Sequence, residues 1–218
     1  MMENIRYSSE AFKSQPKTPT SVSRLDLICS AAVTVFSQKG YDAASVADIA
    51  AASGILKGSL YHYLTAKEDL LFYLISKINE EVIDIANAAE ARHNDPLLQL
   101  RDFARTYTTY NAANRVAVAV YYTSWRQLSE PRYRIARAQR ALMTSYLIDL
   151  LTTAQQSDRI SAHLRPDLAA YFFYGASNSV YTWFPNAHED SVDLVAQEFS
   201  DQWIAMLTAK GQPGLHPR

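Results

Sequence analysis

Residues 45–67 read SVADIAAASGILKGSLYHYLTAK and contain the clearest helix-capping and turn signals of the chain. Ser45 and Asp48 stand three positions apart, which is the spacing of a capping box that satisfies the free N–H groups at the start of a helix. Gly54 follows one short helix later, where a left-handed backbone turns the chain into a second helix. The stretch therefore predicts two short helices, over 45–52 and 56–62, joined by a tight turn.

The second short helix leaves several polar side chains on faces that packing does not need. Lysine can reach guanine edges or phosphates, glycine lets the backbone approach a duplex, and serine, tyrosine and histidine offer hydrogen-bond donors. Thr65 and Glu68 repeat the capping-box spacing and open a long helix, with Lys67 beside free N–H groups where a phosphate would bind. Capped helices around a glycine also occur in small helical domains that bind no DNA, so these residues alone leave both interpretations open.

Apolar residues recur at three- and four-residue spacing through most of the chain, and glycine is scarce. This periodicity is typical of α-helices, and no alternating run indicates a strand. We therefore predict an all-α protein of about nine helices. Besides the two short ones, they fall near 23–39, 66–92, 96–111, 114–128, 131–157, 167–184 and 190–209.

The charge balance permits nucleic acid as a partner without requiring it. Residues 1–67 carry seven Lys or Arg against five Asp or Glu, whereas the remainder is slightly acidic. The one cysteine, Cys29, lies in an apolar helical pattern and is expected to pack in a core, which fits a reducing cytoplasm. The polar N-terminal residues lack the apolar run of an export signal, and the apolar stretch 168–184 is short and interrupted for a membrane span. We expect a cytoplasmic protein that does not contact a membrane.

The residues that enzymes use are present without the patterns that enzymes show. The five histidines have no metal-ligand spacing, and there is no nucleophile elbow or glycine-rich phosphate loop. We therefore expect a protein that is not an enzyme and that holds neither a cofactor nor a metal.

The run GYDAASVADIAAASGILKGSLYHYLTAKEDLL, residues 40–71, closely resembles the DNA-binding segment of the tetracycline-repressor (TetR) family. The likeness covers about 50 residues when the preceding helix is included. It departs from the family at Leu64, where phenylalanine is usual; this position packs inside the domain, and Tyr63 can supply a ring. The resemblance implies that Ser45 caps a helix and touches phosphate, that Lys67 binds phosphate, and that base or backbone contacts come from Lys57, Gly58, Ser59, Tyr61 and His62.

The resemblance also implies an organisation for the whole chain. We expect a disordered arm over 1–22, a three-helix helix-turn-helix DNA-binding domain over 23–67, a ligand-binding and dimerisation domain over 68–210, and a disordered tail over 211–218. A homodimer would bind a palindromic DNA operator, since two recognition helices must reach half-sites about one turn of DNA apart. A ligand bound in the body would tilt the helix that begins near residue 66 and so change the spacing of the two heads.

Two apolar stripes near the C-terminus indicate where the dimer forms. The family's four-helix interface across a two-fold axis favours the last two helices, while the alternative is that both stripes face their own core. The residues that we assign to the interface are Phe172, Gly175, Ala176, Ser179, Trp183, Val195, Phe199 and Trp203.

An unusual density of tyrosine and tryptophan lies between the head and this interface. Rings with a polar tip can line an apolar pocket and still orient a ligand, although each of them also fits a packed helical core. The residues that we assign to the pocket are Tyr107, Tyr110, Tyr121, Tyr122, Trp125, Arg137, Tyr174, Asn178 and Tyr181. Five arginines crowd the same part of the chain and indicate either a solvated helix face or a mouth that accepts phosphate or carboxylate: Arg126, Arg132, Arg134, Arg137 and Arg140.

Scattered positions around Asn178 and Trp183 resemble regulators of lipid and steroid catabolism, several of which sense acyl-CoA thioesters. We therefore predict a ligand-responsive transcriptional regulator, acting as a repressor that a small hydrophobic effector releases from DNA, with an acyl-CoA or related acid as the leading effector. The alternative is a DNA-binding regulator controlled by a protein partner without a small-molecule ligand. An aromatic-rich body favours the first.

Overall fold

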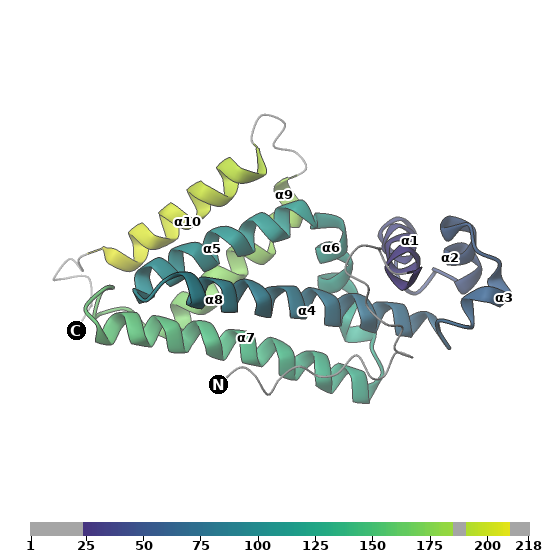
Figure 1. Cartoon of the computed structure of the whole chain (residues 1–218), viewed down its shortest axis with the longest axis horizontal. Helices are drawn as coiled ribbons and strands as arrows, with labels where there is room; N and C mark the ends of the chain where they lie inside the picture. Colours follow the sequence, from purple (N-terminus) through teal and green to yellow (C-terminus); the bar gives the residue numbers. More distant parts are fainter. Residues whose placement is uncertain (1–23, 185–190, 210–218) are drawn as a thin grey trace, which may run out of the picture. The chain divides into compact units, whose positions relative to one another are not determined.

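The computed structural model describes residues 24–184 and 191–209, and every regular element in these ranges is a helix (Figure 1). The predicted arm and tail, the segment 185–190 and residue Lys210 lie outside the described residues. The helices are α1 (Arg24–Lys39), α2 (Val46–Ser53), α3 (Lys57–Leu60), α4 (Lys67–Arg92), α5 (Pro96–Ala113), α6 (Arg115–Ser124), the 3-10 helix η2 (Trp125–Gln127), α7 (Glu130–Gln156), α8 (Pro166–Asn178), α9 (Val180–Trp183) and α10 (Val192–Thr208). The predicted all-α class is confirmed.

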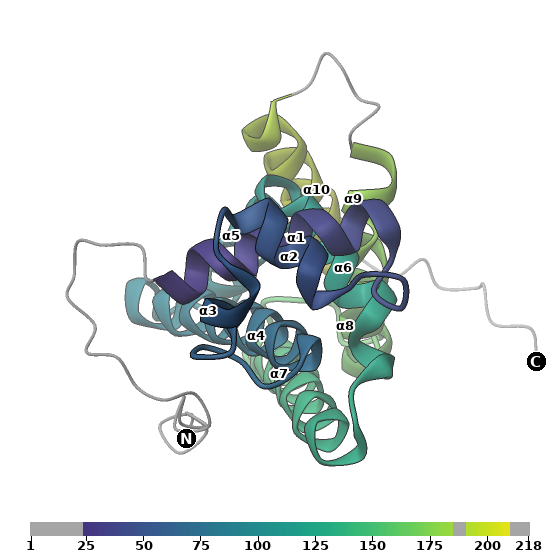
Figure 2. The same ribbon diagram turned by 90° about the vertical axis from the view of Figure 1, so that its right-hand side faces the viewer.

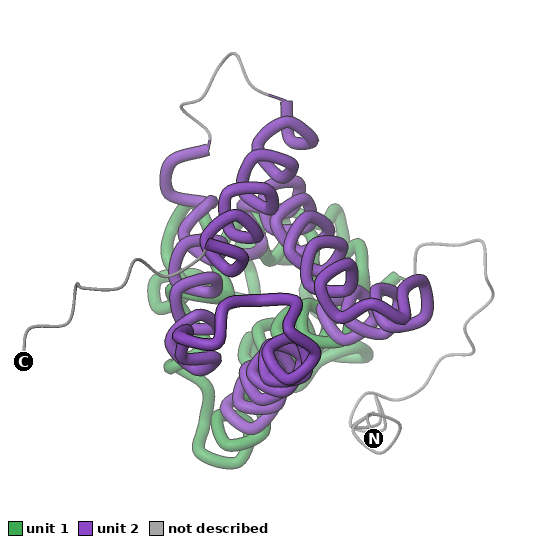
Figure 3. The backbone as a smooth tube through the Cα atoms, turned by 90° about the vertical axis from the view of Figure 1, so that its left-hand side faces the viewer, with its two compact units in different colours: residues 1–80, 119–136 green, residues 81–118, 137–218 purple. Residues whose placement is uncertain are grey.

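The chain divides into two compact units (Figure 3). Unit 1 contains residues 1–80 and 119–136, and unit 2 contains residues 81–118 and 137–218. Helices α4, α6 and α7 each contribute residues to both units. Unit 1 therefore includes a segment from the middle of the chain in addition to the predicted helix-turn-helix.

Unit 1 is built on a small core beneath α1, α2 and α3, the three helices that face the viewer in Figure 2. Ile28, Ile49 and Leu60 are fully buried. Leu64 is buried too, in agreement with its predicted packing role. Cys29 is also buried, and burial raises the pKa of its thiol to about 12. A thiol with such a pKa stays protonated near neutrality, so it behaves as a small apolar core residue.

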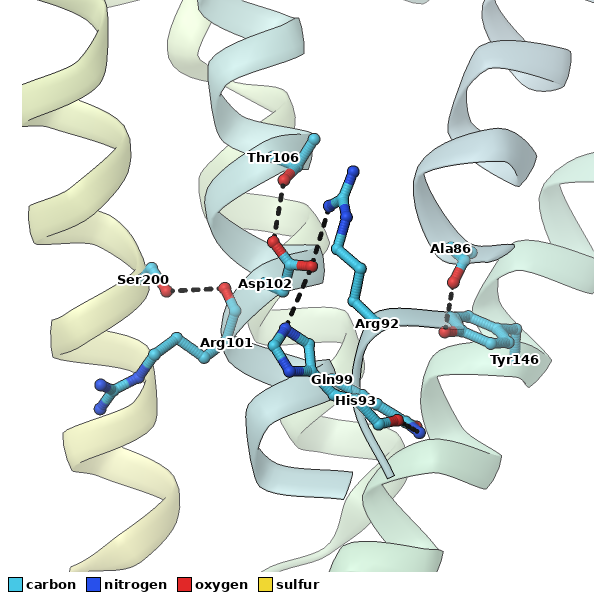
Figure 4. Close-up of polar contacts among 9 residues, drawn as sticks. All are labelled: Ala86, Arg92, His93, Gln99, Arg101, Asp102, Thr106, Tyr146 and Ser200. Carbon is cyan, nitrogen blue, oxygen red and sulfur yellow. Dashed lines mark hydrogen bonds and ion pairs between the residues drawn. The ribbon is translucent and has the colours of Figure 1, made fainter. Parts of the chain in front are cut away.

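Unit 2 places α5 along α10 and against α8. Its centre is aromatic, with Phe173 in ring contact with Phe103, Tyr107 and Trp203. Figure 4 shows polar contacts made by α5: Asp102 accepts hydrogen bonds from Arg92 and Thr106 and lies 3.4 Å from His93. The buried Ser200 hydroxyl of α10 donates to the carbonyl of Arg101.

The predicted helix over 167–184 is divided into α8 and α9 at Ser179. The Ser179 hydroxyl donates to the carbonyl of Ala176 at 2.8 Å, and the Thr182 hydroxyl donates to the carbonyl of Ser179 at 2.6 Å. Hydroxyl groups that bond to nearby carbonyls compete with the helical ladder, which accounts for the break. No helix in the described ranges is long and apolar enough to cross a membrane.

Candidate nucleic-acid interface

The start of α2 is fixed by the predicted capping box. The Ser45 hydroxyl accepts a hydrogen bond from the Asp48 N–H at 3.1 Å, and the Asp48 carboxylate accepts from the Ser45 N–H at 3.0 Å. The carboxylate also accepts from Lys39 at 2.6 Å. The hydrogen bonds from Lys39 and then Ser45 lower the pKa of Asp48 to about 2, so the cap is ionised at neutral pH. Contact between Ser45 and a phosphate remains a prediction.

Gly54 makes the turn that follows α2. Its φ of 65° is in the left-handed region, and its N–H points at the carbonyls of Ala50 and Ala51, which closes the C-terminus of the helix. A side chain at this φ would be strained, which is why the turn needs glycine. This turn sets the direction in which α3 leaves α2.

Helix α3 is only four residues long and is anchored by one buried side chain, Leu60. Around it the chain presents a continuous exposed surface, with Ser59 half-buried within it. Apart from the adjoining residues and the backbone of α3 itself, no atom lies within 4 Å of the position that a Cβ on Gly58 would take, so the backbone there is open to approach. The exposed residues are Leu56, Lys57, Gly58, Tyr61 and His62.

Sequence reasoning gave no role to Leu56, which is 81% exposed. The helical pattern groups it with Ile55 and Leu60 as apolar, and periodicity over so short a helix does not reveal which of the three faces outward. The one signal for an exposed role was that Leu56 stands at the N-cap of α3, where a residue with a capping side chain is usual.

The predicted second capping box is wrong, because the free N–H groups before α4 donate hydrogen bonds to Asp69 rather than to Glu68. The Asp69 carboxylate accepts from the N–H groups of Thr65 at 2.5 Å and Ala66 at 2.9 Å, whereas Glu68 accepts from the N–H of Ser129 at 2.7 Å. Burial alone would raise the pKa of Asp69, but these N–H groups and the Arg132 guanidinium outweigh it and hold the pKa below its ordinary value. Asp69 is thus ionised and buried, and its carboxylate holds the turn between α3 and α4 through these hydrogen bonds.

Lys67 points away from the expected phosphate and into its own unit. Its ammonium donates to the carbonyls of Tyr41 at 2.7 Å, Asp42 at 2.9 Å and Ala44 at 3.0 Å, and it lies 4.5 Å from the centre of the Tyr41 ring. An ammonium has three N–H donors, and all three are used. Lys67 thereby fastens the α1–α2 loop to the start of α4, and its contact with a phosphate remains a prediction.

Three residues of the segment 125–132 make polar contacts with the same region of unit 1. Gln127 donates to the Asp42 carboxylate at 3.1 Å, the Ser129 N–H donates to Glu68, and Arg132 forms ion pairs with Asp69 and Glu68. The Arg132 guanidinium also stacks over the Phe72 ring. The first turn of α7 is therefore part of the structure that supports α3.

Two family models match the chain. The model described as "Bacterial regulatory proteins, tetR family" matches residues 28–74, and the model described as "Tetracyclin repressor-like, C-terminal domain" matches residues 93–207, more than half of the chain. The chain belongs to the TetR family. It is a DNA-binding transcriptional regulator, as the resemblance of residues 40–71 predicted.

Individual relatives agree with this assignment. The transcriptional repressor KstR2 of Mycolicibacterium smegmatis is 25% identical over 194 residues, which cover 84% of this chain and 91% of the relative. The fatty acid metabolism regulator protein of Bacillus subtilis is 28% identical over 178 residues, covering 78% of this chain and 87% of the relative. The solved structure of AibR in complex with isovaleryl coenzyme A and operator DNA has the same fold, with a TM-score of 0.73 at 22% identity over 85% of this chain and 98% of that one.

In unit 2 of this TetR-family chain, three of the residues predicted to line a pocket are in contact. The Tyr107 hydroxyl donates to the Asn178 side-chain oxygen at 2.6 Å, and the rings of Tyr107 and Tyr174 meet edge to face. Asn111, a residue that sequence reasoning did not select, lies 3.5 Å from the same Asn178 oxygen. A buried hydroxyl pair, Thr108 and Ser177, extends this polar group between α5 and α8.

The other predicted pocket residues are distributed between the units. Tyr121 is buried in unit 1 and donates to Asn79 at 3.1 Å, its ring meets that of Tyr122, and Trp125 stacks on Tyr133. Burial, and next the charge of Glu81, raises the pKa of Tyr110 above its ordinary value in unit 2. Tyr181 is half-buried on α9 and Arg137 is exposed on α7. Their role in binding a ligand remains a prediction.

The arginine cluster is not one surface. Arg132 forms ion pairs with Glu68 and Asp69 of α4. Arg134 pairs with Glu130 one turn earlier on α7, with both side chains about three-quarters exposed, and Arg126 lies over the Trp125 ring. Such an exposed pair fits the solvated helix face that the sequence allowed.

The two predicted dimer stripes differ in what covers them. On α8, Phe172 is 60% exposed and Gly175 is exposed, while Ala176 and Ser179 are half-buried. On α10 the stripe turns inward: Val195 joins a core cluster with Val180, and Trp203 is 3% exposed and packs on Phe173. Val195 and Trp203 are therefore core residues of their own chain, which corrects their assignment to a dimer interface. Trp183 is 38% exposed and stacks on the half-buried Phe199.

Proposed function

We propose that this regulator is a homodimeric repressor that binds a palindromic operator through α3 and leaves it when a small hydrophobic effector binds. The observation that carries the DNA side is the exposed surface around α3, in which Lys57, the open backbone at Gly58, Tyr61 and His62 stand on a scaffold fixed at both ends. A fixed scaffold favours affinity because little ordering is needed on binding.

In this proposal α3 enters the major groove. Lys57 offers a cation to guanine or phosphate, Ser59 and Tyr61 offer hydroxyls, and Gly58 allows the backbone to lie close to the base edges. Ser45 adds a phosphate contact from the start of α2. Lys67 supports this surface from behind, because its ammonium is occupied by the α1–α2 loop.

Lys57→Ala and Tyr61→Ala are each expected to weaken operator binding by about 5- to 100-fold per half-site, because each removes a base or phosphate contact. Both side chains are exposed, so thermal stability should change little. Fluorescence anisotropy on an operator selected from random DNA measures the effect. Lys77→Ala is the matched control, since Lys77 is an exposed lysine of α4 that pairs with Asp26. Normal binding by both α3 variants would contradict the docking model.

The stripe on α8 supports the homodimer. Leu168 and Phe172 are exposed and apolar, and the small residues Gly175, Ala176 and Ser179 continue the stripe along the helix. Small residues let two helices approach closely. Covering the exposed apolar side chains with a second copy removes them from water, which stabilises the dimer. Trp183 and Phe199 extend this surface to α9 and α10.

An acyl-CoA or related acid is the effector that we favour. The relatives support this choice, since one is named for fatty acid metabolism and AibR was solved with isovaleryl coenzyme A. Within unit 2, the Tyr107–Asn178 pair supplies a hydroxyl and an amide beside aromatic rings, and these are groups that can orient a thioester or carboxylate. Native mass spectrometry of the purified protein, and operator binding with isovaleryl-CoA against coenzyme A alone, test this choice. An operator affinity that no acyl-CoA changes by more than a factor of two would favour control by a protein partner.

Arg132 is expected to hold the α3–α4 turn in place for DNA binding. Arg132→Met removes the cation from Asp69, which is buried, and from Glu68, so we expect the unfolding midpoint to fall by about 2 to 6 °C and operator affinity to fall with it. Arg134→Met is the control on the same helix and should shift the midpoint by less than about 1 °C, because its pair with Glu130 is exposed. Differential scanning calorimetry and anisotropy measure the two effects; equal midpoints for both variants would count against this role.

A further inference from the structure

Leu56, at the start of α3, is 81% exposed. Among the large hydrophobic residues of the described ranges, Leu56 has the most exposed side chain, and Phe172 follows at 60%. A leucine left in water forgoes the stabilisation that burial would give its side chain. Single exposed leucines are common, so the exposure matters only in combination with the position.

Leu56 occupies the N-cap position of α3, directly before Lys57. Serine, threonine, aspartate or asparagine would stabilise a helix at this position, and leucine makes no capping hydrogen bond. The residue thus lacks both favourable local roles, packing and capping. A side chain that stabilises neither the core nor the helix, at the edge of a DNA-binding surface, is explained by what it contacts when DNA is bound.

The backbone of Leu56 is nevertheless fixed. Its carbonyl accepts hydrogen bonds from the N–H groups of Ser59 at 2.8 Å and Leu60 at 3.2 Å, and Leu60 is fully buried. The side chain is therefore displayed from a rigid point on α3. Of the other exposed residues around α3, Lys57, Gly58 and His62 are not apolar, and Tyr61, which is 52% exposed, ends in a hydroxyl. Leu56 is therefore a fully apolar side chain among groups that suit polar contacts, rather than part of a wide apolar patch.

The major groove presents one apolar group, the C5 methyl of thymine, among polar base edges. We propose that Leu56 packs against this methyl group of a thymine in each operator half-site and so selects thymine over cytosine or uracil there. This assignment rests on the proposed function, that α3 enters the major groove. It adds a contact without hydrogen bonds to the polar contacts that were predicted from the sequence.

The test replaces each thymine of a selected operator, one symmetric pair at a time, by deoxyuridine, which removes only the methyl group and keeps base pairing. For the wild-type protein we expect one pair of positions at which affinity falls by about 4-fold per half-site, roughly 15-fold for the dimer, the effect of leaving one methyl group uncovered on each side. For Leu56→Ala the same replacement should change affinity by less than about 2-fold. Lys57→Ala should bind more weakly overall but keep the full uracil effect.

Leu27→Ala is the matched control, because Leu27 is an exposed leucine of α1 in the same unit. It should keep wild-type affinity and the full uracil effect. The proposal is overturned if no thymine position shows the effect with the wild-type protein, or if Leu56→Ala retains it. Failure of the wild-type protein to select any DNA sequence would instead overturn the proposed function, and this assignment with it.

Discussion

Replacing Lys67 by methionine is expected to lower the midpoint of thermal unfolding by about 5 to 10 °C while leaving the salt dependence of operator binding unchanged. Methionine keeps most of the apolar stem but removes three hydrogen bonds from a charged donor to the carbonyls of Tyr41, Asp42 and Ala44. A loss of about 2 to 3 kcal/mol follows, because carbonyls that partly lack water are left without a donor.

The salt dependence separates this role from a phosphate contact. A lysine that neutralises a phosphate releases a counterion, and its removal flattens the plot of binding constant against salt concentration by about one contact per subunit. Lys77→Met is the matched control on α4, where an exposed pair with Asp26 should contribute less than about 1 kcal/mol. If Lys67→Met flattened the salt dependence with an unchanged unfolding midpoint, the residue would bind phosphate after all.

Replacing Phe172 by glutamate is expected to convert the dimer to a monomer and to reduce operator affinity by more than about 100-fold. The side chain is 60% exposed in the single chain, so the carboxylate is tolerated there, but a second copy would have to bury it against apolar surface. A monomer loses the second half-site, whose contribution comes from the high effective concentration of a linked head.

Sedimentation velocity and anisotropy on the same samples measure the two effects of Phe172→Glu. Leu98→Glu places a carboxylate on another exposed leucine, on α5, and should leave both the mass and the affinity unchanged. A Phe172→Glu protein that still sedimented as a dimer would exclude the α8 stripe from the interface.

The sequence predicted the cap and the turn of α2, whose cause is local. Ser45, Asp48 and Gly54 lie within ten residues of one another, and their hydrogen bonds follow from spacing alone. The partners of Lys67 lie 23 to 26 residues earlier, and that of Arg132 lies 63 residues earlier. Such pairs form because the fold brings distant segments together, so neither helical spacing nor the family motif indicates them.

Periodicity identified apolar faces but not what covers them. The stripes on α8 and α10 are alike in the sequence, yet the one containing Phe172 stays exposed and the one containing Trp203 is buried in its own chain. The difference arises because α10 packs along α5 and must bury one face there. Periodicity did not predict the helix break at Ser179 either, because a serine hydroxyl that bonds to a carbonyl leaves the apolar pattern intact.

Unit 1 is assembled from two separate stretches of the chain, because residues 119–136 complete what residues 1–80 begin. A fragment cut after α4 would therefore lack Ser129 and Arg132 and would leave Glu68 and Asp69 without these partners. For protein engineering, a chimera that carries this head onto another effector-binding body therefore needs three crossovers, one at each boundary between the two units. Operator choice and effector choice in this regulator are consequently not separable by a single recombination point.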